Sequence, residues 1–288
     1  MNKLINKISK MNRTSLIGSS ILLLCFIGFI DWSTGTELSI SIFYLIPIAI
    51  CAWFVNKWTG VVLAIISITI WFLSDYFDSS SYNHPITPYW NALIMLGIFV
   101  LVSELLSALK RVIDRENILA LNIQKNLLPG KNPEISDYKV FSIWEPTRVV
   151  SGDYYDFIQL KENVLGISLA DVCGHGFPAA LLMSNVQATF RIIAGHNHAP
   201  KEVCDHLNSI LISYNMPDKF TSFFYGILDA ENKEFTYSNA GHPPPIILRA
   251  NGKIDRLSVG GFLLGVNPIA KYEQETVYIE SGDIILLY

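Results

Sequence analysis

The sequence predicts a chain of two parts, a bundle of four transmembrane helices followed by an α+β sandwich. The first observation is composition: of 288 residues, 51% are hydrophobic and only 16% are charged, which is less charge than a soluble domain carries. The second is that the apolar residues concentrate before residue 110. The third is that short β-rich runs surround two helical stretches after residue 138, an order that favours an α+β sandwich over regular βαβ alternation.

Long stretches without charge mark the membrane region, which we expect to cover residues 1–109. Crossing the hydrocarbon core takes roughly 20 mostly apolar residues, and four stretches come near or exceed this length. They are Thr14–Ile30, Leu38–Asn56, Trp58–Ser74 and Ser79–Ser103. A cleavable signal peptide is the weaker interpretation of the first stretch, because three more stretches follow it. Pro47 lies inside the second stretch, where proline can kink a helix; a packing role is favoured.

The charges between these stretches predict their orientation. Lys and Arg favour the cytoplasmic side of a membrane, and here they occur before the first stretch, between the second and third, and after the fourth. They are Lys3, Lys7, Lys10, Arg13, Lys57, Lys110, Arg111 and Arg115. The other two connections hold Asp31, Glu37, Asp75, Asp78 and His84. We expect Asp31, Glu37 and His84 to be solvated loop residues, and contact with an external ligand is the weaker interpretation. We therefore expect a multi-pass membrane protein, with its N-terminus and residues after 110 in the cytoplasm.

Residues 110–130 are predicted to be a linker helix that joins the two parts. Apolar residues at alternating steps of four and three start just before it, as in a short heptad pattern. They are Leu105, Leu109, Val112, Leu119 and Ile123, with Glu116 interrupting the series. Pro129-Gly130 ends the helix. Two interpretations stay open: a signalling helix that forms a homodimer, or an amphipathic helix that packs on the next domain.

The second domain, residues 131–288, has seven candidate strands and two candidate helices. The strands are Tyr138–Trp144, Tyr154–Leu160, Val164–Ala170, Ser222–Leu228, Glu234–Ser238, Pro245–Leu248 and Asp283–Tyr288. The helices are Pro178–Ile193 and Lys201–Tyr214. No Gly-x-Gly-x-x-Gly or Walker loop is present, so nucleotide binding of those two types is not indicated.

Carboxylates stand where the candidate strands begin or end. Asp153 starts one strand, Asp156 follows three residues later, and Asp171 comes where the next strand opens into a loop containing Gly174 and Gly176. Mg²⁺ and Mn²⁺ prefer oxygen ligands of this kind, and glycine permits close backbone approach. A single Asp at a strand end is more commonly a turn residue. Taken together, the carboxylates favour a cation site.

Residues from about 120 onward resemble the SpoIIE/RsbU-like bacterial branch of the PPM metal-dependent protein phosphatases. Five motifs of that family occur in order. They are SGDYYDF at 151–157, with Ser151 in place of a glycine; Asp171–Ala180; FTSFFYGILD at 220–229, with Ser222 where threonine is usual; Asn239–Pro243; and GGFLLGV at 260–266. The linker sequence NIQKNLLPG also resembles the approach to the domain in this family.

The resemblance implies α/β/β/α layers and two Mn²⁺ or Mg²⁺ ions. It implies that Asp153, Asp171 and the backbone carbonyl of Val172 are metal ligands, with Asp156 a weaker candidate. A metal-activated water would then hydrolyse phosphoserine or phosphothreonine, and His175 would be either a general acid or a residue that shapes the loop. The implied partner is a phosphorylated anti-sigma-factor antagonist or a similar small regulatory protein.

Several other functions fit poorly. The net charge of −4 offers no basic face for nucleic acid. The four cysteines form no Cys-x-x-Cys pair, so neither structural zinc nor a disulfide framework is indicated. A transporter is disfavoured because the spans hold no buried charge.

The family's Ser/Thr-Asp-Gly motif, expected after GDIILLY at 282–288, is not in the sequence. We therefore expect the phosphatase domain to be incomplete and weak or inactive on its own. A non-catalytic membrane scaffold is the alternative.

Overall fold

The computed structural model describes residues 11–34, 40–77, 86–146, 149–196, 198–216 and 218–288, together with residues 8 and 84. The chain divides into two compact units, Met1–Glu116 and Asn117–Tyr288. The predicted domain bounds at residues 109 and 130 stay a prediction.

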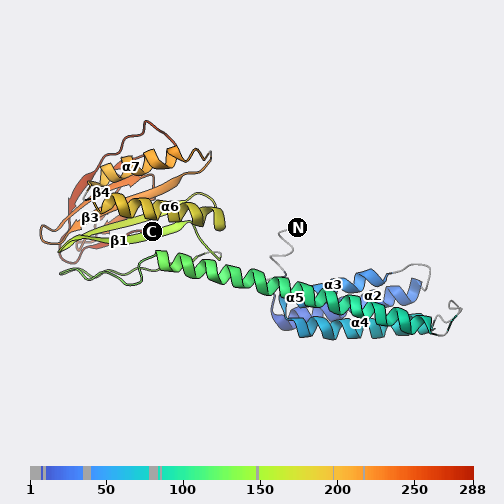
Figure 1. The fold of residues 1–288 in the computed structure, drawn as a ribbon. Helices are drawn as coiled ribbons and strands as arrows, with labels where there is room; N and C mark the ends of the chain where they lie inside the picture. Colours follow the sequence, from blue (N-terminus) through green and yellow to red (C-terminus); the bar gives the residue numbers. More distant parts are fainter. Residues whose placement is uncertain are drawn as a thin grey trace. The chain divides into compact units, whose positions relative to one another are not determined.

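The first unit is helical (Figure 1). Its elements are α2 (Arg13–Thr34), the 3₁₀ helix η2 (Ser41–Tyr44), α3 (Leu45–Phe54), α4 (Lys57–Phe77) and the first part of α5 (Thr87–Leu127). Leu24, Ile48, Leu63 and Phe99 pack together in its core. Three of the helical segments are long and apolar enough to cross a membrane, namely Arg13–Thr34, Lys57–Ser74 and Thr87–Leu127.

The second predicted span is shorter than expected in the described residues. It consists of η2 and α3, which together run from Ser41 to Phe54. Pro47 is the third residue of α3, so its missing N–H falls in the first turn, where no helical partner is needed. The proline therefore stands in the first turn of α3, directly after the 3₁₀ helix η2.

Asp31 is not the solvated loop residue that the sequence predicts. It lies in α2, its residue is 7% exposed, and its Oδ2 accepts a hydrogen bond of 3.1 Å from the Tyr44 hydroxyl. A buried carboxylate needs such a donor because desolvation is costly. His84 is exposed, as expected. Glu37 and Asp78 lie outside the described residues.

The second unit contains two sheets and two helices after the end of α5. Strands β1 (Asp153–Lys161), β2 (Val164–Val172), β3 (Thr221–Asp229), β4 (Glu234–Ala240) and β7 (Gly260–Gly261) follow one another across the first sheet, and β8 (Glu275–Tyr278) also pairs with β4. The second sheet has the order β6 (Ile254–Arg256), β5 (Ile246–Leu248), β9 (Ile284–Leu286). The β4–β7 pair is parallel, and the other pairs are antiparallel.

Two cores lie on either side of the first sheet. Helices α6 (Phe177–Ala194) and α7 (Pro200–Ser213) cover one face (Figure 1), where Phe190 packs against Phe223 and Tyr225. Side chains from both sheets, including Phe235 and Ile247, form the other core. The described residues thus supply helix, sheet and sheet layers of the predicted α+β sandwich.

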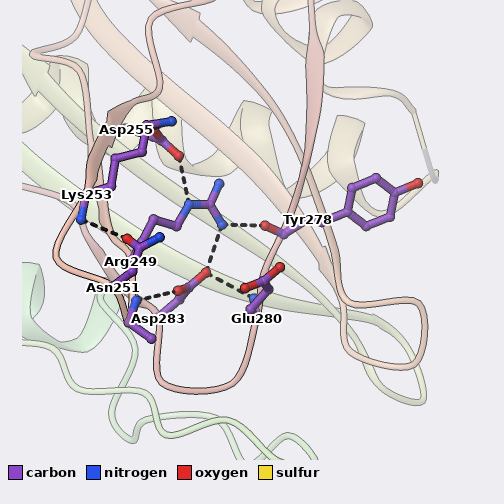
Figure 2. Close-up of polar contacts among 8 residues, drawn as sticks. Arg249, Asn251, Lys253, Asp255, Tyr278, Glu280 and Asp283 are labelled. Atoms are coloured by element: carbon purple, nitrogen blue, oxygen red, sulfur yellow. Dashed lines mark hydrogen bonds and ion pairs between the residues drawn. The ribbon is translucent and has the colours of Figure 1, made fainter.

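An arginine ties the second sheet to β8 (Figure 2). Arg249, which follows β5, donates to Asp255 Oδ2 of β6 at 2.7 Å and to the Tyr278 carbonyl at the end of β8 at 2.6 Å. It also donates to Asp283 Oδ2 at 2.8 Å, just before β9. Asp283, whose side chain is 1% exposed, further accepts the backbone N–H groups of Ala250 and Glu280.

The predicted strand at Tyr138–Trp144 is wrong. Only an isolated bridge between Ile135 and Tyr138 occurs there, and residues 139–146 have no regular structure. A strand needs a hydrogen-bonded neighbour, and among the described residues none pairs with this segment. Val140 and Trp144 still pack on the two cores.

Gly226 in β3 provides a test of the packing between the sheets. A Cβ atom at this position would lie 2.2 Å from Cζ of Phe235, which is held in a stack with Phe224 and Tyr237. We expect Gly226→Ala to lower the free energy of unfolding by about 1–3 kcal/mol through overpacking, measured by thermal or urea unfolding. Gly130→Ala is the matched control, because a Cβ there meets nothing within 4 Å. Equal stability of the two variants would contradict this packing.

Candidate active site

Two carboxylates face each other across the first pair of strands. In the antiparallel register of β1 and β2, Asp153 stands directly opposite Asp171, and opposite residues have Cβ atoms roughly 5 Å apart. Burial, together with the charge of Asp153 and a hydrogen bond to it, raises the pKa of Asp171. Like charges held this close favour an added cation or proton.

The backbone beside this pair is shaped by Gly152. A Cβ atom on Gly152 would lie 2.7 Å from the carbonyl oxygen of Val172, so the close approach of this oxygen needs a glycine. Ser151, which stands in place of a second glycine, donates its hydroxyl to Asp153 Oδ2 at 2.7 Å. The Asp153 N–H in turn donates a hydrogen bond of 3.2 Å to Ser151 Oγ. Ser151 therefore holds the Asp153 side chain in one orientation.

The donor set fits a hard divalent cation. Two carboxylates and a backbone carbonyl are the oxygen ligands that Mg²⁺ and Mn²⁺ take in proteins. Within the part of the chain that the structure describes, no group of three or more His, Cys, Asp or Glu side chains comes together at such a point. The candidate ligands are therefore Asp153, Asp171 and the Val172 carbonyl.

Asp156 is corrected from a candidate metal ligand to a structural residue. It lies three positions after Asp153, so its side chain points to the opposite face of β1, where it is fully buried. Arg191 of α6 donates to both carboxylate oxygens, at 2.6 and 2.9 Å. The Tyr154 hydroxyl and the Phe157 N–H complete its shell at 2.7 and 2.9 Å. These four donors occupy the oxygens that a metal would need.

The loop after Asp171 is held to the start of β3. Cys173 N–H donates to the Phe220 carbonyl at 2.9 Å, and Phe220 N–H donates to Cys173 Sγ at 3.2 Å. Gly174 and Gly176 adopt φ angles of 100° and 69°, a region that favours glycine. His175 between them is exposed. Its side chain therefore reaches the surface beside the aspartate pair.

Ser222 and His242 also belong to this end of the sheet, and the sequence did not predict either as a site residue. Ser222 pairs with Asp171 in register. Its hydroxyl lies 2.8 Å from His242 Nδ1, and Nε2 lies 3.1 Å from the Tyr288 carbonyl. Because a carbonyl only accepts, Nε2 carries the proton and Nδ1 accepts from Ser222. Burial lowers the pKa of His242, opposed by the Tyr288 carbonyl and Asp153.

Asn239 holds the turn after β4. Its Nδ2 donates to the carbonyls of His242 and Leu257, and its Oδ1 accepts the His242 N–H at 2.7 Å. Gly241 in this turn has a φ of 70°. The turn thereby presents the His242 ring to Ser222.

The end of α5 reaches the same site through Gln124. This side chain, 3% exposed, donates to the Ser151 carbonyl at 2.6 Å and accepts the Ser151 N–H at 3.0 Å. Gln187 of α6 also donates to the Leu127 carbonyl at 3.2 Å. The last turns of α5 are therefore bonded to the residue that orients Asp153.

The Arg191–Asp156 pair gives a stability test. Replacing Arg191 by Leu leaves a buried carboxylate without its main partner, which costs about 3–5 kcal/mol in comparable cases. Half of the Arg191 side chain is exposed, so we expect the lower end of this range in urea unfolding. Arg191→Lys keeps the positive charge but loses the two-pronged hydrogen bonding. Its free energy of unfolding should lie between those of wild type and Arg191→Leu. A Leu variant as stable as wild type would contradict the role given to Asp156.

Two cysteines should differ sharply in reactivity. Burial raises the pKa of Cys204 to about 12, which leaves very little thiolate at pH 8. Cys173 is half-buried in the loop after Asp171. We expect iodoacetamide to label Cys173 well before Cys204 in the folded chain, as read by peptide mass spectrometry. The chain unfolded in guanidinium is the control and should label at both; equal rates in the folded chain would refute the burial of Cys204.

The second unit is similar in sequence to known phosphatases. A family profile described as Stage II sporulation protein E (SpoIIE) matches residues 161–288. Phosphoserine phosphatase RsbU of Bacillus subtilis is 30% identical over 198 residues, which cover 68% of this chain and 59% of RsbU. Phosphoserine phosphatase RsbP of the same organism is 28% identical over 178 residues, which cover 60% of this chain and 44% of RsbP. The chain thus spans only part of the length of these relatives.

A solved structure supports the fold. The SiaA-PP2C domain of Pseudomonas aeruginosa superimposes with a TM-score of 0.52 at 19% identity, covering 62% of this chain and 72% of that one. At this identity the likeness concerns the fold alone. The profile match adds the family, whose phosphatases are metal-dependent. The C-terminal part of this chain is therefore a SpoIIE-type phosphatase domain with the PP2C fold.

Proposed function

We propose that the chain is a membrane-anchored, metal-dependent protein phosphatase that acts on phosphoserine or phosphothreonine. The observation that carries the proposal is the Asp153–Asp171 pair, held in register at the strand ends of a SpoIIE-type domain. The relatives RsbU and RsbP are named phosphoserine phosphatases, which supports the reaction class. The proposed substrate is a phosphorylated anti-sigma-factor antagonist or a similar small regulatory protein.

The chain's own residues would hold and orient the reacting groups. Asp153, Asp171 and the Val172 carbonyl are the ligands proposed for two Mn²⁺ or Mg²⁺ ions, whose chemistry when bound is to activate water and to stabilise charge on the phosphoryl group. Ser151 keeps Asp153 in place through its 2.7 Å hydrogen bond. His175, exposed in the adjacent loop, is the proposed donor of a proton to the leaving serine oxygen; shaping the loop is its alternative role.

Membrane anchoring is proposed from the first unit. Three segments have the length and composition of spans, and the shorter helix pair Ser41–Phe54 would complete four. Large side chains such as Leu22, Phe26 and Trp90 are at least 60% exposed there, as expected where lipid is the solvent. The positions of Lys and Arg favour a cytoplasmic N-terminus and a cytoplasmic phosphatase domain in a bacterial inner membrane.

A homodimer through α5 is part of the proposal. The apolar heptad residues of this helix are between 46% and 64% exposed. They are Leu105, Leu109, Val112, Leu119 and Ile123. A second copy with the same stripe is the partner that a heptad pattern specifies. The membrane region, which we propose to be a sensor, would thereby act on paired phosphatase domains.

The function is tested with the full chain in detergent or lipid nanodiscs, completed at its C-terminus with the family's Ser/Thr-Asp-Gly motif, because without that motif weak or no activity is expected. Wild type with Mn²⁺ should release phosphate from a phosphoserine protein, and Asp171→Asn should lower the rate at least about 100-fold, because a ligand that holds the activating charge is lost. Asp137→Asn is the matched control: this residue is exposed with a φ of 61°, which asparagine tolerates well. No Mn²⁺-dependent release by wild type would favour the non-catalytic scaffold.

A further inference from the structure

A shallow open hollow lies beside the candidate active site. It is lined mainly by apolar residues from α6, the end of α7, the loop after α7 and the start of β3. They are Leu182, Leu211, Tyr214, Met216, Lys219, Phe220 and Thr221. Tyr214, Met216 and Phe220 are between 37% and 48% exposed. The hollow therefore offers apolar surface to solvent.

The hollow is continuous with the loop that follows Asp171. Phe220 exchanges two hydrogen bonds with Cys173 in this loop, and Cys173 Sγ lies 3.3 Å from the Asp218 carbonyl. Lys219 lies between the two features: its Nζ is 3.7 Å from the point where a Cβ on Gly174 would be. A chain bound in the hollow would therefore run past the loop that contains His175.

Lys219 supplies a positive charge at this junction. The residue is exposed, and among the described residues its ammonium group forms no ion pair. The Asp153–Asp171 pair nearby is negative, so a bare phosphate dianion approaching it meets repulsion that a lysine offsets. An ammonium group binds phosphate oxygens through charge-assisted hydrogen bonds.

We propose that this hollow is the docking site for the segment of a phosphoprotein that carries the phosphoserine, with Lys219 on the phosphate and the apolar wall around a neighbouring apolar side chain. The proposal rests on the phosphatase function proposed above and adds its substrate preference. The surface combines a positive charge with apolar side chains. A cation alone would bind any anion, and an apolar patch alone would bind any apolar segment. Together they select a phosphoserine flanked by a residue such as Leu.

The binding test uses the full-length Asp171→Asn chain in detergent, which removes turnover and one repelling carboxylate. The probes are two fluorescent peptides with phosphoserine next to Leu or next to Asp, each also made without phosphate. Lys219→Ala should weaken binding of the phospho-Leu peptide roughly tenfold and leave the unphosphorylated peptides unchanged. Met216→Ser should weaken the Leu peptides about threefold and remove the preference for Leu over Asp.

Matched controls are Lys271→Ala, another exposed lysine, and Ile254→Ser, an apolar residue 55% exposed on the second sheet. Neither should change binding, and thermal unfolding should be equal in all four variants. Equal affinity of Lys219→Ala and Lys271→Ala for the phosphopeptide would overturn the proposal. So would a Leu preference that survives Met216→Ser, or no binding of either phosphopeptide.

Turnover separates this inference from the proposed function. In the chain completed with the Ser/Thr-Asp-Gly motif, with Mn²⁺ and Asp171 intact, Met216→Ser should lower kcat/KM for the phospho-Leu peptide but not for p-nitrophenyl phosphate, which has no flanking residue. Turnover of both substrates without any effect of Met216→Ser or Lys219→Ala would refute the docking site and leave the phosphatase standing. Lys219-dependent phosphopeptide binding without any turnover would refute the phosphatase and leave the docking site standing.

Discussion

The antiparallel register of β1 and β2 is the constraint on which the candidate site depends. It sets Asp153 opposite Asp171, and side chains alternate between the faces of a strand. A slip of one residue in β1 would bring Tyr154 toward the second sheet and expose Asp153 to the helices. The register is secured by its neighbours: Tyr154 packs edge-on against Phe190 of α6, and Asp156 is locked to Arg191 of the same helix. Tyr154 and Asp156 on one face of β1 thus fix the position of Asp153 on the other face.

This arrangement explains why two aspartates three residues apart have different roles. Asp156 is fully buried, and four donors satisfy its oxygens, so its charge is compensated within the protein. Asp153 accepts one hydrogen bond from the Ser151 hydroxyl and faces Asp171. Burial and the charge of Asp153 raise the pKa of Asp171. The uncompensated charge is concentrated at the strand ends, beside glycines that leave room for a ligand. An external cation is the partner that such a pair lacks.

The sequence predicted the longer elements of the domain well. The candidate strands at 154–160, 164–170 and 222–228 lie within β1, β2 and β3, because each has nine residues of clear β character. Strands β6, β7 and β8 were missed, since they have two to four residues and, unlike the equally short β5 and β9, no continuous apolar run. Asp153 and Asp171 were selected as candidates because both stand at strand ends, and their role as ligands stays a prediction. Arg191, Gln124 and Ser222 were not, because their importance arises only when distant segments meet.

The junction between α5 and the site shows what tertiary contact adds. Gln124 uses both its amide N–H and its carbonyl oxygen on the backbone of Ser151, in a buried position. Rotating or sliding the last turns of α5 would break both bonds and leave buried polar groups unpaired, each costing about 1–3 kcal/mol. The Ser151 hydroxyl in turn holds Asp153. Any displacement of these turns must therefore either carry Ser151 and Asp153 with it or lose that energy. The orientation of a proposed metal ligand is thus tied to the end of the same helix whose earlier turns form a candidate membrane span.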